Sequence, residues 1–390
     1  MKVLSKESHK KLKSVLSILI PAVLLVGVFL IPRFLGERAS EFYSRFIFPV
    51  VSLPGNIFSG LFHFSLTENV IVVGSIIGLV LFIVFVFMII KKALYSGGAI
   101  RFAVRVISVV LIIALVMSAV FQLMHGINYR RTPVVEKLNL VESDRSIEQY
   151  KEALYWAYLG MVSARSQMGQ DQYGVSHLSS GFEELTGHAN YLVDSFSAQY
   201  DLGMSTNFVR AKPVALSIYW SLTDIVGVYD PFLGEANINT GYIDAKSFPL
   251  TVCHELCHTK GYAGETDCNI IAALSCIGST RADFRYAGYY FIFMDLYTVV
   301  YNYALYNGGE VPGYLKSSNM LPVLRDMQAS SNYWKKIHNM FMSEEISAIS
   351  ESANDAFLKS NGQEGTVTYK VPDNVFLDFY LTYVQEADIM

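Results

Sequence analysis

Three long apolar runs in the first third of the chain constrain its fold more than any other feature of the sequence. They extend over Val15–Ile31, Val70–Ile90 and Val104–Phe121. Each is close to the ~20 residues that an α-helix needs to cross a bilayer, and a backbone in lipid must satisfy its own hydrogen bonds. The runs therefore predict three membrane-spanning helices, with the lipid bilayer as a partner of this part of the chain.

The composition agrees with a chain that is only partly soluble. Charged residues make up 16% of the 390 residues, whereas soluble proteins have roughly 25%. The formal net charge is −4, so no excess of basic residues is present to neutralise a phosphate backbone. Nucleic acid is therefore not an expected partner.

Basic residues flank the three runs unevenly, and such residues tend to stay on the cytoplasmic side of a membrane. The first run is preceded by Lys2, Lys6, Lys10, Lys11 and Lys13, and Lys91, Lys92 and Arg101 lie between the second and third. The remaining flanks carry Arg33, Arg38 and Arg45, offset by Glu37 and Glu41, and then Arg130 and Arg131. The balance predicts a cytoplasmic N-terminus and, after three crossings, a region beyond about Tyr129 that lies outside the cytoplasm.

Three segments of the chain have alternative interpretations. The first run could be a cleaved signal peptide, although no small-x-small site directly follows it. The Phe-rich stretch Phe42–Phe64 is either an interfacial segment or an ordinary loop. A later apolar run, Ala287–Leu305, contains Asp295, and a carboxylate is costly in lipid. We therefore expect that run to be a buried helix of the soluble region rather than a fourth span.

The composition becomes mixed beyond Pro133, which places a membrane domain in residues 1–129 and a second domain in residues 130–390. Helical periodicity is present in Ser146–Met168 and in Gly181–Tyr200. No Pro-rich or Ser-rich linker divides the second domain.

The segment with most chemical information is Cys253-His254-Glu255-Leu256-Cys257-His258. His254 and His258 are four residues apart, so on a helix they share one face and can bind one metal ion. This is the H-E-x-x-H arrangement of zinc metallopeptidases, in which two neutral imidazoles bind Zn²⁺ and the Glu takes a proton from water. Here Glu255 would be that general base.

The flanks of this segment predict a helix that stops soon after the second His. Ser247 is a candidate N-cap, Pro249 lies in the first turn, and Gly261 can end the helix in a left-handed conformation. The chain can then return with a third ligand. We favour Glu265, oriented by Asn269; Asp267 is the alternative, and both acids could simply cap a second helix that extends to about Ile277.

All four cysteines, Cys253, Cys257, Cys268 and Cys276, lie in this same region. A disulfide between residues four apart on one helix is strained, so we expect small apolar core residues. The spacing from Cys253 to His258 has one residue too many for the C-x-x-C-H motif of haem attachment.

Two neighbouring segments could complete a cleft. Gly227–Asn239 reads as an extended stretch with turns, either an edge strand that pairs with a peptide or an ordinary hairpin. Arg285, Tyr286 and Tyr289 could donate a hydrogen bond to a tetrahedral intermediate.

Taken together, these features resemble the bacterial membrane proteins grouped as domain-of-unknown-function family 3810. The resemblance rests on the three spans, Phe232–Asn237, the Cys253–His258 segment with Gly261, Glu265 and Asn269, and Phe284–Tyr289. The chain departs from that family's pattern at Cys257, where the family has a small residue, and at Asp267, where it has Glu. The resemblance implies a zincin-like, membrane-anchored protein of the bacterial cell membrane and no known substrate.

The expected fold is therefore mainly α: three N-terminal transmembrane helices followed by a mostly helical α+β zincin-like extracytoplasmic domain. The expected function is zinc-dependent hydrolysis of a peptide or protein substrate outside the cytoplasm. The alternative is a non-catalytic, zinc-containing envelope protein that binds a protein partner, although such a module needs no general base. An intramembrane protease is disfavoured, because Asp244, Lys246, Lys260 and Glu265 surround the motif with charge.

Overall fold

The computed structural model describes residues 6–140 and 145–385, and Lys2 of the basic N-terminal flank lies outside these ranges. The first part of the chain forms α1 (Lys6–Phe34), α2 (Glu37–Phe42), η1 (Tyr43–Ile47), α3 (Phe48–Gly60), α4 (Leu66–Lys91), η2 (Lys92–Ser96) and α5 (Ala99–Met124). Among the described residues, three helical segments are long and apolar enough to cross a membrane: Leu12–Leu30, Leu66–Ser96 and Ala99–Met124. They match the three runs expected from the sequence, except that the first candidate span ends at Leu30, one residue before the expected run does.

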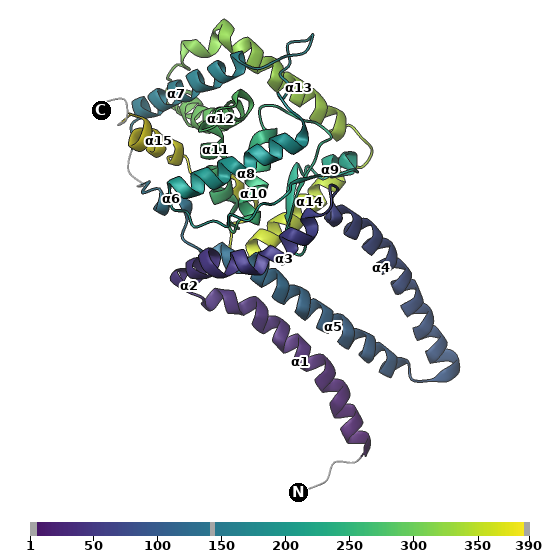
Figure 1. Cartoon of the computed structure of the whole chain (residues 1–390). Coiled ribbons are helices and arrows are strands. Elements are labelled where there is room, and N and C mark those ends of the chain that lie inside the picture. Colours follow the sequence, from purple (N-terminus) through teal and green to yellow (C-terminus); the bar gives the residue numbers. More distant parts are fainter. Residues whose placement is uncertain (1–5, 141–144, 386–390) are drawn as a thin grey trace.

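These three segments project away from the rest of the molecule (Figure 1). Helices α1 and α5 pack side by side, and Ser108 Oγ donates a hydrogen bond to Ser17 Oγ between them at 3.0 Å. Nearly all the large apolar side chains of α4 are exposed. A helix that is apolar on all sides and exposed matches lipid surroundings.

The segment Phe42–Phe64 is helical as far as Gly60, and α3 contacts α5. Most of the segment's large apolar side chains are exposed, whereas Tyr43, Phe48 and several small polar side chains are buried. The exposed set is Phe42, Phe46, Ile47, Val50, Leu53, Ile57, Phe58, Leu61 and Phe64, and the buried polar set is Ser44, Ser52, Asn56 and Ser59. We call the exposed set the apolar face of α2–α3.

The remaining described residues form a helical body, residues 126–140 and 145–385. Its helices are η3 (Gly126–Arg130), α6 (Val134–Lys137), α7 (Ile147–Ser166), α8 (Phe182–Gln199), α9 (Ser217–Leu222), α10 (Phe248–Thr259), α11 (Glu265–Ile277), α12 (Ala282–Asn307), η4 (Gly313–Lys316), η5 (Ser318–Met320), α13 (Leu321–His338), α14 (Ser343–Ser360), η6 (Thr366–Tyr369), α15 (Val375–Phe379) and η7 (Tyr380–Gln385). Its sheet consists of β1 (Lys212–Pro213), β2 (Gly227–Asp230) and β3 (Glu235–Ile238). The fold is mainly helical, as expected.

Helix α12 includes the apolar run Ala287–Leu305 and lies inside the helical body, packed against α7, α10 and α11. Phe284, Ile292, Leu296 and Val300 are buried in the main core. The run is therefore a core helix, and α12 is not among the candidate spans found in the described residues. The predicted helices α7 and α8 are also present, and Ser146 and Gln149 form a capping box at the start of α7.

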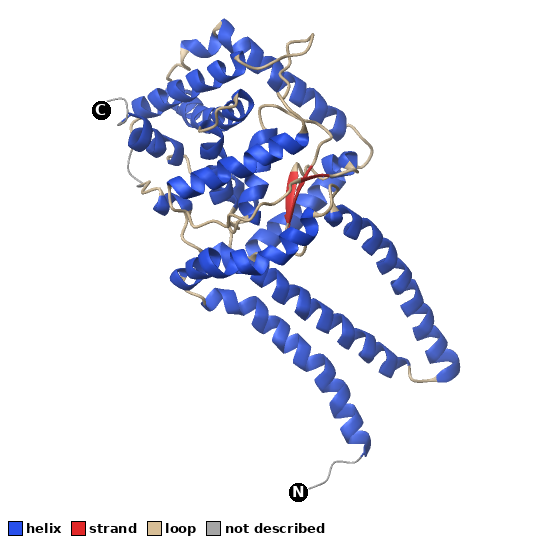
Figure 2. Cartoon of the chain, in the orientation of Figure 1, coloured by secondary structure: helices blue, strands red, loops and turns tan. Residues whose placement is uncertain are grey.

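The small sheet, drawn in red in Figure 2, lies at one side of the helical body. Its strand order is β1-β3-β2, with β1 parallel and β2 antiparallel to β3. It joins the helical body to α3 and α4. Lys212 of β1 and Glu235 of β3 form a fully buried ion pair, and Lys212 Nζ also donates to the Ser59 carbonyl of α3. Glu235 in turn accepts hydrogen bonds from the Thr67 backbone N–H at 2.9 Å and the Thr67 hydroxyl at 2.8 Å, in the first turn of α4.

A second carboxylate strengthens this junction. Ser65 caps α4 by accepting a hydrogen bond from the Glu68 N–H at 2.9 Å. The side chain of Glu68 reaches into the helical body, where it accepts from the Ala215 and Leu216 N–H groups, each at 2.8 Å. The start of α4 is therefore held to the sheet by buried, charge-assisted hydrogen bonds.

The junction can be tested by removing the cation of the buried pair. Changing Lys212→Met leaves Glu235 buried without its cation, and we expect this to lower the free energy of unfolding by about 3–5 kcal/mol. Lys370→Met removes the cation of a pair in which both side chains are more than half exposed, and should cost less than about 1 kcal/mol. Thermal unfolding of both variants in detergent measures the difference, and equal midpoints would contradict a structural role for the buried pair.

Candidate metal centre

Helix α10 carries His254 and His258 on one buried face. The helix begins at Phe248, with Pro249 in its first turn, and ends at Thr259. Ser247 occupies the N-cap position as expected, but its side chain makes no capping hydrogen bond. Gly261 has φ +99°, a left-handed conformation that lets the chain turn back directly after the helix.

The reversal after α10 is held in place by Arg131. Its Nη1 donates a hydrogen bond to the Gly261 carbonyl at 2.8 Å, and its guanidinium lies 3.9 Å from the centre of the Tyr262 ring. Helix α11 then begins at Glu265, so this carboxylate points back toward α10. The Glu265 Oε2 atom lies 3.1 Å from His254 Nε2 and 3.4 Å from His258 Nε2.

The partners of the two imidazoles determine which ring nitrogens carry protons. His258 Nδ1 lies 3.0 Å from the Tyr262 carbonyl, which can only accept a hydrogen bond, so Nδ1 is the donor. Asn269 donates through Nδ2 to the Tyr369 carbonyl, so its Oδ1, 2.8 Å from His254 Nδ1, is also an acceptor. In the neutral imidazoles, both Nε2 atoms therefore present lone pairs.

Three hydrogen-bond acceptors thus converge on one buried point. The two Nε2 atoms are 3.1 Å apart, and the three side chains form the cluster of the described residues that could hold a metal ion. Neutral imidazole lone pairs at this distance from each other and from a carboxylate repel unless a cation lies between them. The arrangement therefore suits a cation.

The spacing and donor types fit Zn²⁺. Tetrahedral ligands at zinc bond lengths of about 2.0–2.1 Å lie about 3.3 Å from one another, and the observed separations are 3.1, 3.1 and 3.4 Å. Nitrogen donors disfavour Ca²⁺ and Mg²⁺, which prefer oxygen ligands. In each imidazole the other ring nitrogen donates to an oxygen, as metal-binding histidines usually do.

Burial and charge act on Glu265 in opposite directions. Burial alone would raise the pKa of Glu265, but positive charge beside it, as on His258 and His254 when they are protonated, holds this pKa well below its usual range. The carboxylate is therefore ionised and available as a ligand.

Glu255 lies beside the cluster without being part of it. Its carboxylate packs against Gly227 of β2, where an added Cβ would lie only 2.6 Å from Glu255 Oε1. Burial raises the pKa of Glu255 to about 8. A glycine at this point of β2 therefore leaves the space that the carboxylate occupies.

Glu265 and the alternative ligand Asp267 have different surroundings in the structure. Asp267 points away from the imidazoles and accepts a hydrogen bond from the Val134 N–H at 2.9 Å, at the start of α6. Burial raises its pKa to about 6. The expectation that Asn269 orients Glu265 was wrong: Asn269 hydrogen bonds His254 instead, because it lies one turn further along α11.

The four cysteines are free and buried, as expected of small core residues. Cys276 Sγ lies 3.7 Å from Cys253 Sγ, where α11 packs on α10. Cys268 Sγ lies 3.4 Å from His258 Nδ1. The cysteines thus pack α11 against the helix that carries the histidines.

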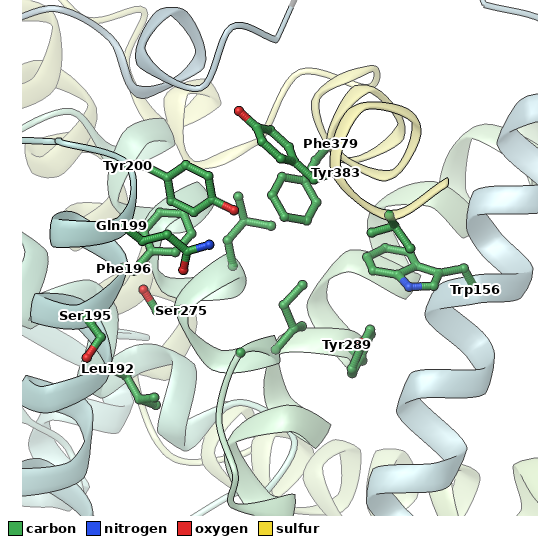
Figure 3. Close-up of a pocket in the computed structure, with 14 residues that line it drawn as sticks. Trp156, Leu192, Ser195, Phe196, Gln199, Tyr200, Ser275, Tyr289, Phe379 and Tyr383 are labelled. Carbon is green, nitrogen blue, oxygen red and sulfur yellow. The ribbon is translucent and has the colours of Figure 1, made fainter. Parts of the chain in front are cut away.

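The suggested role of Arg285, Tyr286 and Tyr289 was wrong, because α12 lies away from the metal centre. Arg285 donates to the carbonyls of Ser279 and Thr280, and Tyr286 donates to Asp326 at 2.8 Å. Tyr289 lines a separate cavity of about 380 Å³, between α8, α11 and the C-terminal helices (Figure 3). His254, Glu255, His258 and Glu265 do not line that cavity.

The metal centre opens into a larger cavity of about 1110 Å³. Helix α10 contributes His254, Glu255 and His258, and one wall consists of Ile225–Tyr229 in and before β2. A second wall comes from α14, and the cavity extends to side chains of α1 and α5. The α14 wall consists of Ser347, Ser350, Glu351, Ala353, Asn354, Phe357 and Ser360, and the α1 and α5 side chains are Phe29, Met117, Ser118 and Phe121.

Three polar side chains near the centre were not found from the sequence. Tyr369 lies close to Glu265, and Tyr229 stacks on His258 with 6.1 Å between ring centres. The ring of His125, directly after α5, lies 5.7 Å from that of His258, and burial lowers the pKa of His125 to about 3. No local pattern distinguishes these residues, because each is distant in sequence from α10.

Comparison with known proteins gives one match. A family model described as a protein of unknown function (DUF3810) matches residues 43–372, most of the chain. No curated protein and no solved structure matches the chain.

Metal analysis of the full-length protein tests the ligand set. We expect Glu265→Ala to lower zinc affinity by at least about 10-fold, the order found even for outer-shell changes. Asp267→Asn, which keeps an acceptor for the Val134 N–H, should retain zinc. Inductively coupled plasma mass spectrometry after dialysis against graded chelator measures both, and a larger loss in Asp267→Asn would assign the ligand to Asp267.

Proposed function

We propose that this chain, which belongs to the protein family of unknown function DUF3810, is a membrane-anchored zinc metallopeptidase that hydrolyses peptide bonds outside the cytoplasm. The observation that carries the proposal is the convergence of two imidazole lone pairs and one carboxylate beside Glu255, at the wall of a large cavity. Two neutral His ligands and one carboxylate leave a bound Zn²⁺ with net positive charge and an open position. When bound, zinc would polarise the scissile carbonyl and make water a stronger acid.

Glu255 is the general base in this proposal. It faces the same cavity as His254 and His258, but its side chain leaves the helix about 100° around from theirs, so it can reach a water molecule without being a ligand. It takes the proton of the attacking water and later gives it to the leaving amine. The raised pKa favours holding that proton between the two steps, while positive charge at the centre acts in the opposite direction.

The edge strand β2 would hold the substrate. Among the described residues β3 is the only strand that pairs with β2, and Val226–Tyr229 line the cavity. An extended peptide can add to such an edge by main-chain hydrogen bonds. Because Gly227 abuts Glu255, the peptide bond opposite Gly227 would lie next to the general base.

The catalytic residues can be tested with two variants that spare the ligands. Glu255→Gln should retain about one zinc per chain and abolish hydrolysis, because an amide cannot accept the proton. Gly227→Ala should also retain zinc, and should lower kcat at least about 10-fold because the added methyl displaces Glu255. Hydrolysis of a mixed pool of quenched-fluorescent peptides measures both activities.

The outcomes separate the two functions under consideration. Full activity in Glu255→Gln would contradict the peptidase mechanism, and loss of zinc would make Glu255 a ligand. A wild-type protein that binds zinc but cleaves no peptide would favour the alternative, a non-catalytic envelope protein that uses the same cleft to bind a protein partner.

The proposal also requires the helical body to lie outside the cytoplasm, as the basic flanks predict. A single Cys at Tyr173, an exposed position in the helical body, should react with an impermeant maleimide on intact cells. A single Cys at Tyr95, equally exposed but between α4 and α5, should react only after lysis. The reverse pattern of labelling would show that the helical body lies in the cytoplasm, and would contradict the predicted topology.

A further inference from the structure

We infer that the cleft takes its substrate from the membrane: its occupant is the extended segment of a membrane-anchored polypeptide directly beyond that polypeptide's spanning helix. The inference rests on the proposed peptidase function and deepens it by naming the class of substrate. Four structural features support it.

The first feature is a continuous cavity wall. The side chains of Phe29 in α1 and of Met117 and Ser118 in α5 line the same cavity as His254 and Glu255. Met117 lies seven residues before the end of α5 at Met124, which at 1.5 Å per residue is about 10 Å along the helix. The cavity therefore reaches down along the candidate spans instead of ending above them.

The second feature is the short distance from the metal centre to the end of α5. His125 directly follows α5, and its ring lies 5.7 Å from that of His258. Tyr229, which stacks on His258, donates a hydrogen bond to the Met124 carbonyl at 3.3 Å. Opposite them, Phe357 of α14 packs on Phe121 of α5 with 5.8 Å between ring centres. The centre thus lies within a side chain's length of a membrane helix.

The third feature is the apolar face of α2–α3, which marks the level of the membrane surface. The segment from α2 to α3 exposes a row of Phe, Val, Leu and Ile side chains, and most of its buried side chains are small and polar, which matches helices that lie in the lipid interface. Gly55 of α3 lies against Leu233, at the tip of the β2–β3 hairpin, and near Met124 of α5. The hairpin tip and the end of α5 are therefore both at this level.

The fourth feature is the direction of the edge strand. At one end of β2, Gly227 abuts Glu255; at the other end, Asp230 Oδ2 lies 2.9 Å from the hydroxyl oxygen of Thr67, in the first turn of α4. Three residues of strand cover about 10 Å. A peptide paired along β2 would leave the membrane near Thr67 and reach Glu255 after about three residues.

These features favour a tethered peptide over the other possible occupants. A soluble peptide needs the edge strand but not a cavity that extends along α1 and α5. A phospholipid would use the apolar part of the cavity but would leave the open edge of β2 without a partner.

The test uses full-length protein in vesicles of phosphatidylethanolamine and phosphatidylglycerol. The tethered probe is a synthetic Leu-rich span of about 20 residues that continues into a quenched-fluorescent tail of about twelve randomised residues. The control probe is the same tail without the span. We expect the tethered tail to be cleaved at least about 10-fold faster, at sites about three to six residues beyond the span, as mass spectrometry of the products would show.

A matched pair of variants tests the path along α5. Ser118→Trp fills the cavity and should slow cleavage of the tethered tail at least about 10-fold with zinc content unchanged. Val116→Trp lies at nearly the same depth on the exposed face of α5 and should have no such effect. Equal cleavage rates for the two probes, or an unaffected Ser118→Trp variant, would overturn the inference while leaving the peptidase proposal intact.

A readout independent of hydrolysis covers the case in which neither tail is cleaved. In the Glu255→Gln protein, a photoreactive phenylalanine at position 118 should crosslink to the tethered tail, and one at position 116 should not. A crosslink from position 118 without hydrolysis by the wild-type protein would support the membrane source and contradict the peptidase proposal. No crosslink, or a crosslink to phospholipid alone, would overturn the inference.

Discussion

The buried ion pair between Lys212 and Glu235 ties the two parts of this molecule together. Both side chains have no exposed surface, and their remaining hydrogen bonds go to Ser59 of α3 and Thr67 of α4. A single buried ion pair need not stabilise a fold, because the free-energy cost of removing both charges from water offsets their Coulombic attraction. Here the pair joins β1 to β3 and both strands to the membrane helices, so its geometry fixes the sheet, and with it the cleft wall β2, against the start of α4.

The metal centre is built on a different balance, in which groups that repel one another are brought together by helix packing. The packing of α11 on α10, with Cys276 against Cys253, places Glu265 against the two imidazoles. Asn269 and the Tyr262 carbonyl hold each Nδ1 as a donor and leave the Nε2 lone pairs directed inward. The surrounding fold must offset this repulsion when no cation is bound, and a bound cation converts it into attraction. Binding of a metal ion by these three side chains would therefore be coupled to folding stability.

Local patterns in the sequence predicted the parts of the structure that depend on neighbouring residues. Hydropathy located the three spans, and the i, i+4 spacing with Gly261 located His254, His258 and the reversal that returns Glu265. The predictions from the sequence were wrong where the position of a side chain depends on how elements that are distant in the sequence pack together. The spacing of Asn269 in α11 does not reveal that it contacts His254, and nothing local shows that α12 carries Tyr286 and Tyr289 away from the centre. The contributions of α5 and α14 to the cavity are likewise set by tertiary contacts alone.

The rigid junction has a consequence for how such an enzyme would select its substrates. A catalytic domain on a flexible linker samples many heights above the bilayer, and its reach grows with linker length. In this chain η3 directly follows α5, and the Glu235 and Glu68 hydrogen bonds hold the sheet to the first turn of α4. The height of Glu255 above the membrane helices is therefore set by the fold. Distance from the bilayer would then contribute to specificity, because only peptide bonds that an extended chain brings to that height can reach both the edge of β2 and the general base.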